Sequence, residues 1–183
     1  ETLRVLARRN PKAAVHGVST VQEELGLRGA RTSAFGIDPD AGIAIDVTHA
    51  SDYPGAEKST SGEVQLGKGP VLHRGANINS VLGELMVTIA KRKRIPYQFT
   101  AEPRATGTDA NVIQLNRAGV AAALVSIPNR YMHTPVEVVS LKDLEDAVRL
   151  ITETVCALTA RTDFRPLEAH RRRPGLTRKR RRH

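Results

Sequence analysis

The stretch AAALVSIPNRYMHTPVEVVSLKDLEDAVRLITETVCAL (residues 121–158) decides the fold class, because it joins strand-like runs to the clearest helical pattern in the chain. Residues 121–127 and 136–139 are short apolar runs with β-branched members, which are typical of strands. The helical part opens with Ser140 and Asp143, which together resemble a capping box. Its apolar residues recur on one face: Leu141, Leu144, Val148, Ile151, Val155 and Leu158. The stretch therefore predicts strands followed by an amphipathic helix.

The same alternation continues toward the N-terminus. Further strand-like runs occupy residues 13–21, 42–47, 70–73 and 97–100. Apolar residues at helical spacing over residues 78–89, closed by a basic run and Pro96, predict a helix. A shorter helix is predicted over residues 108–118, with its first residue as the cap. Repeated strand and helix alternation predicts an α/β layered domain.

The two ends of the chain differ from this body. The opening segment ETLRVLARRN (residues 1–10) predicts a helix that ends before Pro11, although neither a Met nor a clear N-cap precedes it. We therefore expect the chain to begin inside a helix, as a fragment of a longer protein. At the other end, the Arg-rich residues 166–183 have little apolar surface to bury, so we expect a disordered tail after a domain of residues 1–165.

Net charge separates the tail from the body. The formal net charge is +9, yet residues 168–183 alone hold eight Lys or Arg and one carboxylate. The remaining residues are therefore nearly neutral in net charge, which argues against a domain that binds nucleic acid through its own surface. The longest apolar stretch, residues 118–125, is far shorter than the roughly 18 residues of a membrane span. The single cysteine excludes an internal disulfide and fits a reducing compartment, so we expect a cytoplasmic protein without membrane contact.

Ionisable side chains follow several strand-like runs where each run ends. They are Glu23, Glu24, Asp46, His49, Asp109 and His133. In an open α/β sheet, ligands gather outside the carboxyl ends of the strands, so these side chains are expected to converge. Carboxylates and an imidazole suit zinc or a similar divalent cation, and a further carboxylate could accept a proton from bound water. The sequence thus predicts hydrolytic metal chemistry.

Each candidate also has a simpler interpretation. Glu23 and Glu24 precede Leu-Gly, which is compatible with a solvated turn. His133 could cap a backbone group in its loop, and Asp109 could be a favourable carboxylate in the first turn of a helix. Asp46 is harder to explain structurally, since it ends an apolar run and buried aspartate is rare without a partner. Spacing alone leaves these alternatives open.

Six motifs at and around these residues resemble one known family. They are VQEELGLRGA (21–30), AIDVTHASDYPG (44–55), LGKGPVLHRGANIN (66–79), IPYQ (95–98), TGTDAN (106–111) and SIPNRYMHTPVEVVSLKDLE (126–145). They resemble the C-terminal part of the tetrahedral, glutamyl or deblocking aminopeptidases, which are metallopeptidase family forty-two. The resemblance covers about residues 1–165 and implies part of a catalytic domain in which helices flank a mixed sheet.

The resemblance also implies roles for individual residues. Glu23 corresponds to the general base, Glu24 and His133 to ligands of the second metal, and Asp46 to a ligand of the first metal. The remaining candidates are expected at the substrate or behind the ligands: His49, Thr108, Asp109, Arg130 and Tyr131. The family binds two bridged divalent ions, zinc or cobalt, cleaves peptides and forms hollow dodecamers.

Two elements that the resemblance requires lie outside this sequence. The family also uses a His for the first metal and an Asp that bridges both ions, and both belong to an upstream segment. We therefore expect the 183-residue chain to be inactive alone, and assembly into the dodecamer is not predicted for it. The alternative is a non-catalytic remnant whose basic tail binds nucleic acid or another polyanion.

Overall fold

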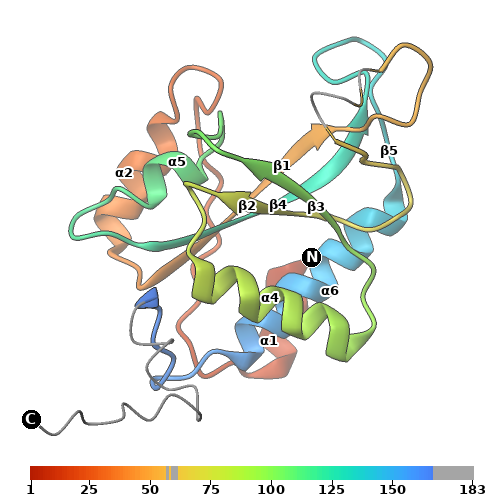
Figure 1. Cartoon of the computed structure of the whole chain (residues 1–183). Coiled ribbons are helices and arrows are strands. Elements are labelled where there is room, and N and C mark those ends of the chain that lie inside the picture. Colours follow the sequence, from red (N-terminus) through yellow and green to blue (C-terminus); the bar gives the residue numbers. More distant parts are fainter. Residues whose placement is uncertain (57, 59–61, 167–183) are drawn as a thin grey trace, which may run out of the picture.

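A mixed β-sheet organises the chain in the computed structural model, which describes residues 1–56, 58 and 62–166 (Figure 1). Its strands are β1 (Ala41–His49), β2 (Val71–Gly75), β3 (Gln98–Glu102), β4 (Ala121–Arg130) and β5 (Val138–Val139). The order across the sheet is β1-β4-β2-β3, and β5 pairs with β4 at its end. β1 is parallel to β4 and β2 is parallel to β3, whereas β2 and β4 are antiparallel. The predicted α/β mixed sheet is confirmed.

β4 is the central strand, and its sequence explains this position. All of its residues from Ala121 to Asn129 are buried, as expected for a continuous apolar run that is flanked by strands and covered on both faces. Its register against β1 places Asp46 beside Ser126 and His49 beside Asn129. The carboxyl ends of β1 and β4 therefore meet at the same edge of the sheet.

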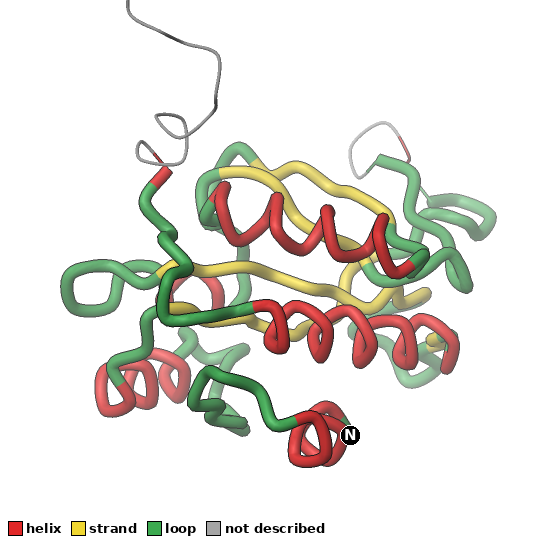
Figure 2. The backbone as a smooth tube through the Cα atoms, turned by 90° about the horizontal axis from the view of Figure 1, so that it is seen from below, coloured by secondary structure: helices red, strands yellow, loops and turns green. Residues whose placement is uncertain are grey.

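Helices cover both faces of this sheet. They are α1 (Thr2–Arg9), α2 (Arg28–Ile37), α4 (Ser80–Lys93), α5 (Ala110–Ile113) and α6 (Leu141–Ala157). The larger core lies where α1, α4 and α6 pack on one face, and Figure 2 shows the long helices lying alongside the strands. The smaller core lies on the opposite face, where Ala110 and Ile113 of α5 contact Ala44 and Leu124.

Local sequence features set the ends of α4. The Asn79 side chain accepts hydrogen bonds from the backbone N–H groups of Val81 and Leu82, at 3.1 and 3.0 Å, and so caps the first turn. The helix ends at Arg94, which adopts a left-handed conformation with φ 53°. The predicted helix is confirmed, and the basic residues of its last turn complement the helix dipole.

The capping box predicted for α6 is wrong. Ser140 occupies the N-cap but makes no side-chain capping bond. Asp143 is fully buried and instead accepts backbone hydrogen bonds from Gly67 at 2.7 Å and Gly69 at 2.8 Å. A carboxylate in the first turn of a helix can accept hydrogen bonds from its own helix or from a neighbouring loop, and Asp143 accepts them from the loop.

Two further predictions differ from the structure. Residues 13–21 were expected to form a strand, but no strand in the described part of the chain pairs with them, and Val15, Val18 and Val21 are exposed. The helix expected from Thr108 is only four residues long, because the chain turns soon afterwards, with Arg117 in a left-handed conformation.

The described residues contain no helix that is both long and apolar enough to cross a membrane. The predicted disordered tail lies, from residue 167 onward, outside the described residues. The domain boundary at residue 165 therefore stays a prediction.

Candidate active site

A tight turn before α2 carries Glu23 and Glu24. The turn is closed by hydrogen bonds from the N–H groups of Gly26 and Leu27 to the Glu23 carbonyl, at 3.2 and 2.9 Å. Gly29 then packs so closely against the backbone of Val21 that a Cβ atom would overlap it. The turn is thus fixed at both ends, and it leaves Glu24 exposed while Glu23 is half-buried.

Glu24 and His133 meet although 109 residues separate them. His133 Nε2 lies 2.9 Å from Glu24 Oε1, and both side chains are largely open to solvent, at 66% and 73% exposure. An imidazole and a carboxylate side by side are two of the donor types that zinc takes from proteins. The imidazole therefore does not cap a backbone group, which was the simpler interpretation of His133.

Asp46 and Glu23 belong to a cluster of mutually repelling carboxylates. Burial raises the pKa of Asp46 above its usual value, and the charges of Asp109 and Glu24 raise it further. Burial also raises the pKa of Glu23, with added contributions from Asp46, Glu24 and Asp109. His133 opposes this effect on both groups. Negative charge is thus concentrated around the imidazole of His133, as in a site that is suited to cations.

Asp109 faces this cluster instead of capping α5. It occupies the N-cap without making a side-chain capping bond, and its Oδ2 accepts a hydrogen bond of 2.7 Å from Thr20 Oγ1. Its Oδ1 is buried and has no hydrogen-bond partner, which is uncommon for a carboxylate oxygen. Thr108 lies beside it and shares a 2.8 Å hydrogen bond with Thr106. A group that supplies a proton or a positive charge would satisfy Asp109.

The other predicted site residues, Arg130, Tyr131 and His49, lie at or just after the ends of β4 and β1. Arg130 makes a bidentate pair with Asp52, at 2.8 and 2.7 Å, which lowers the pKa of that carboxyl group. The Tyr131 ring packs against Tyr53 with 4.9 Å between ring centres. His49 is exposed at the end of β1. Arg130 and Tyr131 thus connect the end of β4 to the loop after β1.

Sequence reasoning missed two residues of this region, Glu137 and Asn129. Glu137 accepts hydrogen bonds from the His133 backbone N–H and from the Asn129 side chain. The only available signal was a carboxylate four residues after the candidate histidine. His73, in contrast, is a buried packing residue that contacts Ser126 and Thr100, and burial lowers its pKa to about 4.

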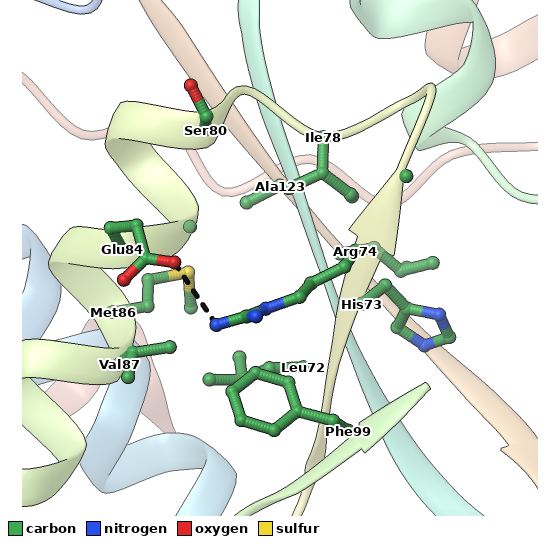
Figure 3. Close-up of a pocket in the computed structure, with 13 residues that line it drawn as sticks. Leu72, His73, Arg74, Ile78, Ser80, Glu84, Met86, Val87, Phe99 and Ala123 are labelled. Atoms are coloured by element: carbon green, nitrogen blue, oxygen red, sulfur yellow. Dashed lines mark hydrogen bonds and ion pairs between the residues drawn. The ribbon is translucent and has the colours of Figure 1, made fainter. Parts of the chain in front are cut away.

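A separate concavity of about 220 Å³ lies between α4, β2 and β3 (Figure 3). Arg74 crosses it, with its guanidinium 4.5 Å from the centre of the Phe99 ring and 3.1 Å from Glu84. No candidate site residue lines it. It is therefore distinct from the carboxylate cluster.

The donor set fits a divalent cation in type but is incomplete in number. Within residues 1–56, 58 and 62–166, no three His, Cys, Asp or Glu side chains are close enough together to hold a metal ion. Charges influence one another over several ångströms, whereas zinc ligands lie about 2.0–2.2 Å from the ion. Glu24 and His133 thus form a pair of adjacent donors, and Asp46 lies nearby without completing a third position.

Comparisons with known proteins identify relatives of this chain. The chain is 48% identical over 141 residues to the lysyl aminopeptidase of Pyrococcus furiosus, covering 76% of this chain and 39% of that protein. It matches the TET aminopeptidase of the marine sediment archaeon Thaumarchaeota archaeon SCGC AB-539-E09 with a TM-score of 0.80 and 36% identity, over 87% of this chain and 45% of the other. The chain thus spans less than half the length of these relatives.

A third match is to a protein that is described by its assembly. The TET1 peptidase of Pyrococcus horikoshii, described as assembling into a tetrahedron or a large octahedral shell, matches with a TM-score of 0.60 and 31% identity. The match covers 76% of this chain and 40% of that one. The profile of the M42 glutamyl aminopeptidases matches residues 1–150. This chain therefore belongs to the M42 glutamyl aminopeptidase family.

Proposed function

We propose that this chain supplies one part of the active site of a metal-dependent aminopeptidase, which removes N-terminal residues from peptides. The observation that carries the proposal is the Glu24–His133 contact beside the carboxylates of Glu23 and Asp46, at the carboxyl edge of the sheet. Family membership and the names of its relatives support the reaction class.

The residues divide into ligands and a base. Glu24 and His133 would hold one divalent ion, and Asp46 would contribute to a second. Such ions, when bound, acidify water and polarise a carbonyl group. Glu23 would accept the proton from the attacking water, for which a carboxylate with a raised pKa is better suited than an ordinary one. The negative charge around it would also attract the positively charged amino group of a peptide.

The chain alone is proposed to be inactive, because the resemblance places a histidine and a bridging aspartate in a further segment. A groove of about 660 Å³ beside β1 could receive that segment. β1 is the first strand in the order of the sheet, and the groove is lined by its residues Ala41–Ile45, by residues 13–20 and by Asp109. Exposed strand edges readily pair with another strand.

A chimera tests the proposal. This chain replaces the matching part of the Pyrococcus furiosus lysyl aminopeptidase, and release of N-terminal residues is measured with zinc or cobalt. The chimera is expected to be active, and Glu23→Gln is expected to lower kcat by about 10²–10⁴-fold. The control Glu145→Gln, on the exposed surface of α6, should leave kcat unchanged. A folded, metal-loaded chimera that is inactive would contradict the proposal, as would metal-dependent activity of the isolated chain.

A further inference from the structure

The loop that carries His133 is held in an unusual backbone conformation. Tyr131 and His133 both have left-handed backbone angles, with φ 60° and 62°, which side-chain-bearing residues rarely adopt. Thr134 closes the turn, since its backbone N–H and its hydroxyl both donate to the Tyr131 carbonyl, at 3.1 and 2.6 Å. Such conformations persist only where surrounding contacts determine them. Something beyond the turn must therefore hold His133.

Glu137 makes the contact that reaches from this loop to the sheet. Its Oε1 accepts a hydrogen bond of 2.6 Å from the backbone N–H of His133. Its Oε2 accepts one of 2.9 Å from Asn129 Nδ2. Both bonds lower the pKa of Glu137, with the bond from Asn129 contributing most. An ionised carboxylate has two acceptor oxygens and no donor, so it matches two N–H groups that converge on it.

Asn129 is a rigid anchor for this bridge. It is 1% exposed, lies near the end of the central strand β4 and pairs with Val139 of β5. Its carbonyl also accepts a hydrogen bond of 2.9 Å from the N–H of Ala50, just after β1. Glu137 thus connects a buried, strand-paired residue of β4 to the backbone of the residue whose imidazole meets Glu24.

We propose that Glu137 is a positioning residue for metal binding: its carboxylate fixes the backbone of His133, so that the imidazole points at the site shared with Glu24. The inference rests on the proposed function, in which His133 is a ligand. Residues that orient a metal ligand change metal affinity by about 10–100-fold when they are removed. Glu137 is expected to act in this range although it does not touch the ion.

The test uses the full 183-residue chain and zinc chloride, with NMR signals of the His133 amide and imidazole as readouts. Glu137→Ala is expected to speed hydrogen exchange at the His133 amide and to weaken zinc binding at its imidazole about tenfold or more. Glu137→Gln is expected to restore both, because its amide oxygen can accept from His133. Its amide N–H can donate to Asn129 Oδ1, which is buried without a partner, once the Asn129 amide turns over to present that oxygen in place of Nδ2. Glu145→Ala, on the exposed surface of α6, is the matched control.

The outcomes separate this inference from the proposed function. Equal zinc affinity in the wild type and Glu137→Ala would overturn the positioning role, and so would an unchanged His133 amide. If zinc shifts no His133 signal even in the wild type, Glu24 and His133 do not bind zinc without the further segment, and an unchanged His133 amide in Glu137→Ala would then overturn the positioning role. The proposed function fails separately, through an inactive metal-loaded chimera. Should Glu137→Ala not fold, Glu137→Asp serves instead. It keeps the charge but is one methylene shorter, so it should lose one of the two bonds and weaken zinc binding.

Discussion

The buried carboxylate of Asp143 offers the most quantitative prediction of how this fold is stabilised. Its two oxygens accept the N–H groups of Gly67 and Gly69, which joins the first turn of α6 to the loop before β2. Hydrogen bonds to charged groups contribute about 1.5–3 kcal/mol each, so Asp143→Ala should lower the free energy of unfolding by about 3–6 kcal/mol. This is a large share of the roughly 5–15 kcal/mol that stabilises an ordinary domain.

Urea unfolding followed by circular dichroism measures this effect. Asp143→Asn keeps one acceptor oxygen and should lose about half as much stability as Asp143→Ala. Glu145→Ala changes an exposed carboxylate two residues further along α6 and should lower the free energy of unfolding by less than about 0.5 kcal/mol. If Asp143→Ala destabilised the chain no more than Glu145→Ala, Asp143 would not hold the loop before β2.

Three more predictions concern charge. Because the pKa of Asp46 is raised in the folded chain, the free energy of unfolding should fall as pH rises through that pKa. Asp46→Asn should therefore stabilise the chain at neutral pH but not in acid. Urea unfolding at both pH values measures this difference. The lowered pKa of Asp52 has the opposite effect on the pH dependence of stability, so Asp52→Asn should destabilise the chain at neutral pH by about 1–3 kcal/mol. In acid, the difference in stability between this variant and the wild type should become small. If the basic tail binds DNA, binding should not depend on the DNA sequence, and the logarithm of the binding constant should fall with the logarithm of salt concentration with a slope of about −7. Binding should vanish when residues 168–183 are deleted. DNA binding by residues 1–167 would contradict this.

The parts of the fold that could be predicted are those with a strong local pattern. β4 is a continuous apolar run and α6 has apolar residues at helical spacing, so each specifies its own conformation. Residues 13–21 carry an equally good strand pattern, yet a strand also needs a hydrogen-bonding neighbour, which no local pattern supplies. The prediction for Asp143 named the wrong hydrogen-bond partner for the same reason: Gly69, whose N–H it accepts, lies 74 residues away in the sequence.

The candidate site divides in a similar way. Glu24 and His133 each follow a strand-like run in the sequence. Although residues 13–21 form no strand, the structure brings the two side chains into contact. The contribution of Glu137 could not be predicted, because it depends on a left-handed loop that returns its carboxylate to Asn129. Residues that support a site are defined by three-dimensional geometry, whereas the ligands themselves keep recognisable residue types.

The central claim is that Glu24, His133 and Asp46 hold the metal ions of an aminopeptidase. Anomalous diffraction at the zinc edge, from crystals of the chimera with the Pyrococcus furiosus enzyme, tests it most directly. One anomalous peak is expected about 2.0–2.2 Å from His133 and Glu24, and a second at that distance from Asp46. Zinc peaks located away from these three side chains in an active chimera would contradict it.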